Sequence, residues 1–181
     1  MSIHIVYETH STTEDNEAGI ATGWLPGDLS AAGREQAALL GKRRRDNVDV
    51  VFSSDLRRAI QTVEIAFRHT PVRIRQDSRL RECDYGELNG APVTELLPRV
   101  KHIDRPFPGG QSYRDVVELT RDFLRELSRN HVGHRILLVA HSANRWALQH
   151  LLEGARLEDL VDAPFQWQEG WHYQLPARWT G

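Results

Sequence analysis

The sequence predicts an α/β fold built on a mostly parallel central sheet, and three observations support this. Short runs of β-branched and apolar residues alternate with longer segments rich in helix-forming residues, as expected of strands joined by helical crossovers. The run at 135–140, RILLVA, is apolar at almost every position, which is typical of a strand buried on both faces. Polar and titratable side chains follow several of these runs directly, so we expect them along one edge of the sheet.

The composition is that of an ordinary globular protein, and it restricts the partners. The 181 residues fit one domain, 1–181, and the net charge of -2 argues against a nucleic-acid groove or an anionic membrane surface. The single cysteine, Cys83, excludes an internal disulfide and is expected to be a small buried filler. No apolar run approaches the roughly 20 residues of a membrane span, and the N-terminus lacks the layout of a signal peptide. We expect a cytoplasmic protein with no nucleic-acid or membrane partner, and a homodimer is left open.

The first elements can be placed from their composition. A strand is expected at 3–7, and it runs directly into small polar residues around a histidine. Residues 31–45 have the composition of a helix that Ser30 caps. This helix ends in four consecutive basic residues, 42–45, which we interpret as a solvated helix end because cations suit the carbonyl end of a helix.

The middle of the chain contains two further strands and a long irregular stretch. A strand at 48–52 leads into a helix to about residue 68, for which Ser-Ser-Asp at 53–55 supplies caps. Arg58 falls in the first turn of that helix, where backbone amides and the helix dipole favour an anion. A short strand at 72–75 leads on to Glu82. Glycines and prolines then interrupt 85–111, so this stretch is interpreted as a lid or specificity insertion with a short helix at 92–100.

The last third returns to the regular alternation. Ser112 caps a long helix to about residue 130, with Asp115 as its capping-box partner. The strand at 135–140 ends at His141, and the helix that follows over 143–153 is closed by Gly154. Alternating aromatic and polar residues at 165–175 predict one or two edge strands.

Four side chains suited to chemistry lie just beyond the predicted strands: His10, Arg58, Glu82 and His141. Taken singly, each such residue is more often a surface or structural group. The carboxyl ends of parallel strands meet at one edge of a sheet, however, so the four together predict a shared site.

Motifs spread along the chain in a fixed order identify a family. They are His10 with Thr13 and Asn16; Gly23-Trp24; Leu29-Ser30 with Gly33; the run 54–62, SDLRRAIQT; Leu80-Arg81-Glu82; Pro108-Gly109-Gly110-Gln111-Ser112; and Val139-Ala140-His141-Ser142. With these motifs, which reach to about residue 152, the chain resembles the histidine phosphatase superfamily. The resemblance implies a three-layer α/β/α sandwich of the phosphoglycerate-mutase-like kind.

The resemblance also implies a function, a phosphomonoester hydrolase that acts through a phosphohistidine on a small, anionic phosphorylated metabolite. His10 would be the nucleophile, Arg58 and His141 would bind the phosphoryl oxygens with help from Asn16, and Glu82 would protonate the leaving oxygen and then activate water. Neutral imidazole is nucleophilic near neutral pH, and charged donors stabilise the equatorial oxygens, so the chemistry agrees with these roles. The scheme needs no metal and no other cofactor.

The sequence departs from the family pattern beside both histidines. The family carries Arg-His-Gly at the first histidine, where this chain has Thr-His-Ser, and the second histidine is followed by serine in place of glycine. Glu8 stands where the family normally has an apolar strand residue. The site has therefore lost one cation, and hydroxyl groups are available to replace it. The expected substrate-binding residues are Glu8, Thr9, Ser11, Thr13, Asn16 and Ser142.

The orientation of Glu8 decides how serious this departure is. Losing one transition-state donor lowers a rate by about 10²–10³-fold. A carboxylate about 6 Å from a phosphoryl dianion, at an effective dielectric of about 20, would add roughly 6 kcal/mol of repulsion. The sequence leaves open whether Glu8 faces the pocket or turns away and pairs with an arginine such as Arg145.

Two other interpretations are carried alongside the phosphatase. One is a catalytically weak or inactive relative that binds a ligand or partner. The other is different chemistry in the altered pocket, where Glu8, His10, Glu82 and His141 are ligand types that a divalent metal accepts, although their spacing matches no metal motif. Basic residues in the insertion either supply positive charge to an anionic substrate or form a solvated loop. These basic residues are Arg99, Lys101, His102 and Arg105.

Overall fold

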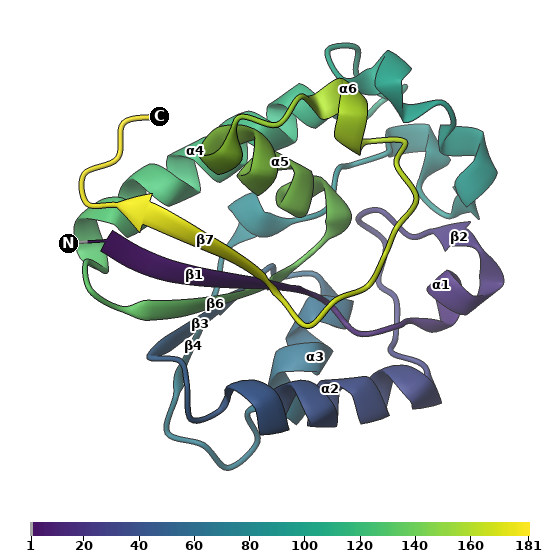
Figure 1. Cartoon of the computed structure of the whole chain (residues 1–181). Coiled ribbons are helices and arrows are strands. Elements are labelled where there is room, and N and C mark those ends of the chain that lie inside the picture. Colours follow the sequence, from purple (N-terminus) through teal and green to yellow (C-terminus); the bar gives the residue numbers. More distant parts are fainter. Residues whose placement is uncertain (1) are drawn as a thin grey trace.

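The computed structural model describes residues 2–181 and places a twisted sheet between two layers of helices (Figure 1). The strand order is β4-β3-β6-β1-β7, in which the first four strands are parallel and β7 pairs antiparallel with β1 at one edge. The predicted α/β fold with a mostly parallel sheet is confirmed. The strands are β1 (Ser2–Thr9), β3 (Val50–Ser53), β4 (Arg73–Gln76), β6 (Arg135–Ala140) and β7 (Trp171–Pro176).

The two faces of the sheet are covered by different helix pairs (Figure 1). Ile5 and Tyr7 of β1 pack in the core that includes α4 (Tyr113–Asn130) and α5 (Ser142–Glu153). Val6 packs on the other side, in the core that includes residues of α2 (Ala31–Arg44) and α3 (Arg57–Ala66). Side chains alternate across a strand, so Glu8 follows Val6 onto the face covered by α2.

Several local expectations need correction. The N-cap of α3 is Leu56, which makes no side-chain cap bond, so the predicted caps at 53–55 are wrong. The Asp55 carboxylate pairs with Arg81 (2.6 Å), and the Ser54 hydroxyl contacts His141 and accepts from the backbone N–H of Leu56 itself (3.3 Å). In the tail, β7 begins at Trp171, and residues 165–170 form a loop that crosses the carboxyl edge of the sheet.

The insertion at 85–111 is built from short turns. The helix predicted at 92–100 is replaced by two 3₁₀ turns, η3 (Val93–Leu96) and η4 (Arg99–His102), because Pro98 lies between them. Apolar side chains of the insertion pack on α4 and α5. The remaining elements are α1 (Glu14–Ala18), β2 (Ile20–Ala21), η1 (Ser78–Leu80), η2 (Gly86–Leu88), β5 (Ala91–Pro92) and α6 (Leu157–Leu160).

Across residues 2–181, the structure contains no helix with both the length and the apolar character needed to cross a bilayer.

Candidate active site

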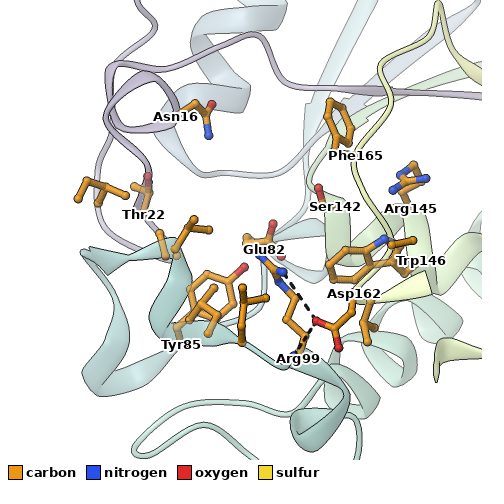
Figure 2. A pocket seen from close by; sticks show the side chains of 18 of the residues that line it. Asn16, Thr22, Glu82, Tyr85, Arg99, Ser142, Arg145, Trp146, Asp162 and Phe165 are labelled. Atoms are coloured by element: carbon orange, nitrogen blue, oxygen red, sulfur yellow. Dashed lines mark hydrogen bonds and ion pairs between the residues drawn. The ribbon is translucent and has the colours of Figure 1, made fainter. Parts of the chain in front are cut away.

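A pocket of about 400 Å³ lies at the carboxyl edge of the sheet, and we call it the first pocket (Figure 2). His10 follows β1, Arg58 lies in the first turn of α3, and Glu82 follows η1; all three line this pocket. His141 follows β6, and its ring centroid lies 5.1 Å from that of His10. The structure therefore brings all four candidate catalytic side chains to one place.

One ring nitrogen of His10, Nε2, makes no hydrogen bond to any of the described residues. The Nδ1 of His10 lies 2.8 Å from the carbonyl oxygen of Ser11. A carbonyl can only accept a hydrogen bond, so Nδ1 carries the proton and Nε2 keeps its lone pair. Desolvation and the neighbouring Arg58 guanidinium lower the pKa of His10 from 6.5 to about 3. The imidazole is thus neutral at physiological pH, which is the form that a nucleophile requires.

His141 is fully buried and held from two sides. Its Nε2 lies 2.7 Å from the Ser54 hydroxyl, and its backbone N–H donates to Asn144 Oδ1 (3.0 Å). Desolvation, reinforced by Arg58 and His10, lowers the pKa of His141 well below its ordinary value. Among the residues described, its Nδ1 has no hydrogen-bond partner. A fixed, neutral imidazole with one unpartnered nitrogen is suited to bind a ligand oxygen.

Arg58 brings a buried positive charge to the site. Its Nη2 donates to the carbonyl oxygen of Gly23 (2.9 Å), while its Nη1 is buried and finds no partner within residues 2–181. Only 3 % of this residue is exposed. A buried guanidinium with an unused donor is costly unless an anion completes it, so Arg58 is suited to bind a negatively charged ligand.

Glu82 is buried at the centre of the first pocket (Figure 2). Its Oε1 accepts a hydrogen bond from the backbone N–H of Cys83 (2.8 Å). Burial raises the pKa of Glu82, so its carboxyl group keeps a proton at higher pH than an exposed glutamate does. Burial likewise raises the pKa of the Cys83 thiol, and that side chain is fully buried, as expected of a structural filler.

Asn16 and Thr13 have different places in the structure. Asn16 Oδ1 accepts from the backbone N–H of Thr13 (3.0 Å), and Figure 2 shows the amide group of Asn16 pointing into the pocket. The Thr13 hydroxyl accepts from the backbone N–H of Asn16 (2.9 Å), and Thr13 lines neither of the pockets described here. Thr13 therefore caps α1 and positions Asn16, contrary to the expectation that it contacts the substrate.

Glu8 turns towards α2 and is 2 % exposed. Arg43 Nη2 donates to its Oε2 (3.0 Å), and Arg44 Nε donates to its Oε1 (2.8 Å). The interpretation of 42–45 as a solvated helix end is therefore wrong for these two arginines. The last turn of α2 lies against the sheet, and both side chains bind Glu8 of β1. The partner considered from the sequence, Arg145, lies with its guanidinium 5.0 Å from the ring centroid of Trp171 instead. Two guanidiniums offset the carboxylate, so it does not repel a phosphoryl group as an isolated charge would.

A second pocket, of about 740 Å³, also has His10 in its walls. Five residues line both pockets: His10, Asn16, Val93, Ser142 and Phe165. Thr9, Ser11 and Glu8 line the second pocket and are absent from the walls of the first. Of the predicted substrate-binding residues, Asn16 and Ser142 therefore reach both pockets, while the residues that flank His10 in sequence face the second one.

The supporting contacts include several that sequence reasoning missed. Ser54 holds His141, the Gly23 carbonyl holds Arg58, and the Thr62 hydroxyl accepts from the backbone N–H of Ser11 (3.0 Å). Ser54 and Thr62 both fall within the motif 54–62, so their place in that motif could have indicated that they support the site. The contacts themselves join segments up to 87 residues apart.

Glu8→Gln is expected to lower the free energy of unfolding by about 3 kcal/mol, because it leaves two half-buried guanidiniums without a counter-charge. Urea unfolding of both proteins measures the change. The matched control is Asp104→Asn, which breaks the exposed pair with Arg114 and should lower the free energy of unfolding by less than about 1 kcal/mol. Equal effects of the two substitutions would show that burial adds nothing to the Glu8 pairs.

The arrangement suits enzymes that transfer a phosphoryl group through a histidine: a neutral imidazole, a buried arginine and a buried carboxyl group with a raised pKa share one pocket. Residues 9–168 match the model of the histidine phosphatase superfamily (branch 1), and the chain belongs to this superfamily. Within the part of the chain that is described, no cluster of three or more His, Cys, Asp or Glu side chains is placed to hold a metal ion.

The named relatives are phosphatases and mutases. The chain is 30% identical over 166 residues to phosphoserine phosphatase 1 of Hydrogenobacter thermophilus, covering 86% of this chain and 78% of that protein. It is 31% identical over 173 residues to a 2,3-bisphosphoglycerate-dependent phosphoglycerate mutase of Methylobacterium sp., covering 86% and 83% of the two chains. A mycobacterial glucosyl-3-phosphoglycerate phosphatase superposes with a TM-score of 0.76 at 27% identity, covering 87% of this chain and 85% of that one.

Proposed function

We propose that the protein hydrolyses a small anionic phosphomonoester through a phosphorylated His10. The observation that carries this proposal is the free Nε2 of His10 beside two unpartnered buried nitrogens, Nη1 of Arg58 and Nδ1 of His141. A phosphoryl group at this point gives each of them an oxygen to bind. Glu82 lies in the same pocket and supplies the proton that the leaving oxygen needs.

The reaction then has two displacements. His10 Nε2 attacks phosphorus, the bond to the leaving oxygen breaks, and the proton of Glu82 passes to that oxygen. Glu82, now a carboxylate, takes a proton from water, whose oxygen attacks phosphorus and breaks the P–N bond. Inorganic phosphate leaves, and His10 returns to its neutral state with Glu82 protonated.

The phosphoryl oxygens have one charged donor and several neutral ones. Arg58 supplies the charge, and the amide of Asn16 points into the same pocket (Figure 2). The Ser54 hydroxyl accepts from the backbone N–H of Leu56 (3.3 Å), so its own proton is available for His141 Nε2. That arrangement leaves the proton of His141 on Nδ1, where it can be donated to a phosphoryl oxygen.

Arg99 extends the proposal to the organic part of the substrate. The nearby carboxylate of Asp162 accepts from the backbone N–H groups of Arg99 and Val100 (2.8 and 3.0 Å), while the Arg99 guanidinium lies 3.9 Å from it (Figure 2). Asp162 is thus engaged mainly with the backbone, and the guanidinium is available to a ligand. The relatives named for phosphoserine and phosphoglycerate act on molecules that carry a carboxylate. We propose that the insertion at 85–111 places Arg99 to bind such a second anionic group.

Arg99→Ala is expected to raise KM about 10–100-fold for phosphomonoesters with a carboxylate and to leave kcat within a few-fold, because a charge-assisted hydrogen bond contributes about 1.5–3 kcal/mol. The KM for p-nitrophenyl phosphate, which has no carboxylate, should change little. Arg105→Ala, an exposed arginine of the same insertion, is the control. Equal KM changes for the two substrates would remove Arg99 from substrate recognition.

The experiment for the function as a whole is a phosphate trap. The protein is incubated with a panel of ³²P-labelled phosphomonoesters, quenched, and examined for protein-bound phosphate that is labile in acid and stable in base. Turnover with such a label supports the proposal. Turnover without it would require another nucleophile, and the absence of turnover across the panel would favour a ligand-binding relative.

A further inference from the structure

The second pocket is larger than a phosphoryl oxygen requires. It has a volume of about 740 Å³, and its walls combine hydroxyl groups near His10 with an apolar side formed by Leu39 and Leu40 of α2 and by Trp167 of the tail. The side chain of Trp167 is 58% exposed at this wall, and Arg43 lies 5.7 Å from its ring centroid. A cavity of this size and character is suited to an organic group with apolar or aromatic surface.

The position of the catalytic groups separates the roles of the two pockets. Glu82 and Arg58 line the first pocket and are absent from the walls of the second. The leaving oxygen takes its proton from Glu82, so the leaving group lies in the first pocket. Thr9 and Ser11 line the second pocket, which therefore adjoins the phosphoryl group on a side away from Glu82. An organic group bound in the second pocket is therefore an ester group that stays on phosphorus when the leaving oxygen takes its proton from Glu82.

The charged side chains around the second pocket do not favour a second anionic oxygen. Arg58 keeps one buried donor without a partner in the described chain, and the lowered pKa values of His10 and His141 keep both imidazoles neutral. In the second pocket Glu8 and Arg43 form an ion pair, and the remaining charged residue of its walls, Glu169, is acidic. The walls of the second pocket therefore add no net positive charge, so this side of the phosphoryl group suits an esterified oxygen better than a second anionic one.

We propose that the site also hydrolyses phosphodiesters, with the leaving alcohol in the first pocket and the ester group that stays on phosphorus, apolar or aromatic, in the second. This activity rests on the proposed function because it uses the same nucleophile. His10 Nε2 forms the bond to phosphorus, the bond to the leaving oxygen breaks, and Glu82 gives that oxygen its proton. Water then displaces His10, so the product is a phosphomonoester that carries the remaining organic group.

Thr9 is the residue that opens this space. Its short side chain lies in the second pocket next to His10. A long guanidinium there would occupy part of the pocket and add a positive charge beside the phosphoryl group. Thr9→Arg is therefore expected to raise the kcat/KM for monoesters and to lower that for diesters. The change is made with Glu8 intact, because Glu8 holds Arg43 and Arg44.

The test compares p-nitrophenyl phosphate with p-nitrophenyl phenyl phosphate. We expect the wild-type protein to release p-nitrophenol from both, to form phenyl phosphate from the diester, and to show a transient mass increase of one phenyl phosphoryl group on His10.

Leu39→Trp fills the second pocket from an exposed position of α2. It should lower kcat/KM for the diester at least about tenfold and leave kcat/KM for the monoester within about twofold. Ala38→Trp, an exposed residue of the same helix outside the pocket walls, should change neither value.

The outcomes separate this inference from the proposed function. Monoester turnover without diester turnover would overturn the diester activity and leave the phosphatase intact. Diester turnover that Leu39→Trp does not reduce would overturn the assignment of the second pocket. Failure with both substrates would overturn both proposals together. A labelled His10 that carries phosphate but never the phenyl group would also contradict the diester reaction.

Discussion

His10→Ala is expected to lower the phosphatase kcat by about 10⁴-fold or more and to abolish acid-labile phosphate on the protein. The imidazole is the group that forms the covalent bond in the proposed reaction, and removal of a nucleophile typically leaves only the rate due to binding and oxyanion stabilisation. Arg58 and His141 keep their hydrogen bonds to Gly23 and Ser54 in this variant, so substrate binding should persist. Initial rates with p-nitrophenyl phosphate and the ³²P trap measure the two effects.

The control for this substitution is His172→Ala. His172 lies on β7, is exposed, and stacks on His4, with 5.3 Å between the ring centroids. This substitution removes an imidazole of the same size at a residue that lines neither pocket, so turnover and labelling should match those of the wild-type protein. If His10→Ala retained a labelled histidine or more than about one hundredth of the wild-type kcat, His10 would not be the nucleophile.

The sheet and the meeting of the four catalytic candidates could be predicted because both follow from chain order. Strands that alternate with helices become parallel, and parallel strands end at one edge. His10 and His141 follow the neighbouring strands β1 and β6, so their rings are adjacent, with centroids 5.1 Å apart. The adjacency of the two rings thus follows from where the strands end in the sequence and does not depend on side-chain contacts.

The orientation of Glu8 could be predicted only in part. Alternation along β1 places it on the same face as Val6, away from the face of Tyr7. The identity of its partners depends on where the last turn of α2 meets the sheet, 35 and 36 residues later in the chain. A run of basic residues at a helix end is usually solvated, and only the packing of α2 shows that Arg43 and Arg44 are not.

The two pockets could not be predicted from the sequence, for a related reason. Their volumes depend on where the tail at 165–170 crosses the edge of the sheet, and that segment was expected to be a strand. Phe165 lines both pockets and Trp167 lines the second, because the chain there forms a loop over His10 and not an extension of β7. Composition alone favoured a strand, since aromatic residues alternate with polar ones.

Glu82→Gln is expected to lower kcat for alkyl phosphates by about 10²–10⁴-fold, because the amide can neither protonate the leaving oxygen nor activate water. With p-nitrophenyl phosphate the leaving group needs no proton, so the first displacement should survive and the second should fail. The variant should then show a burst of p-nitrophenol equal to the enzyme concentration and accumulate phosphorylated His10. Stopped-flow absorbance and the ³²P trap measure these two quantities.

The pH dependence gives a second, independent readout of the same role. In the proposed reaction Glu82 acts in the first step as an acid, and burial raises its pKa. The kcat/KM for an alkyl phosphate should therefore be retained below that pKa and fall as the pH rises through it. The fall at low pH reflects protonation of His10, whose pKa is lowered to about 3 in the free enzyme. Glu82→Gln should remove the alkaline fall and keep the acid one. Glu87→Gln, an exposed glutamate of the insertion, should preserve both. An unchanged alkaline fall in Glu82→Gln would assign the proton to another group and would leave the burial of this carboxyl without a catalytic purpose.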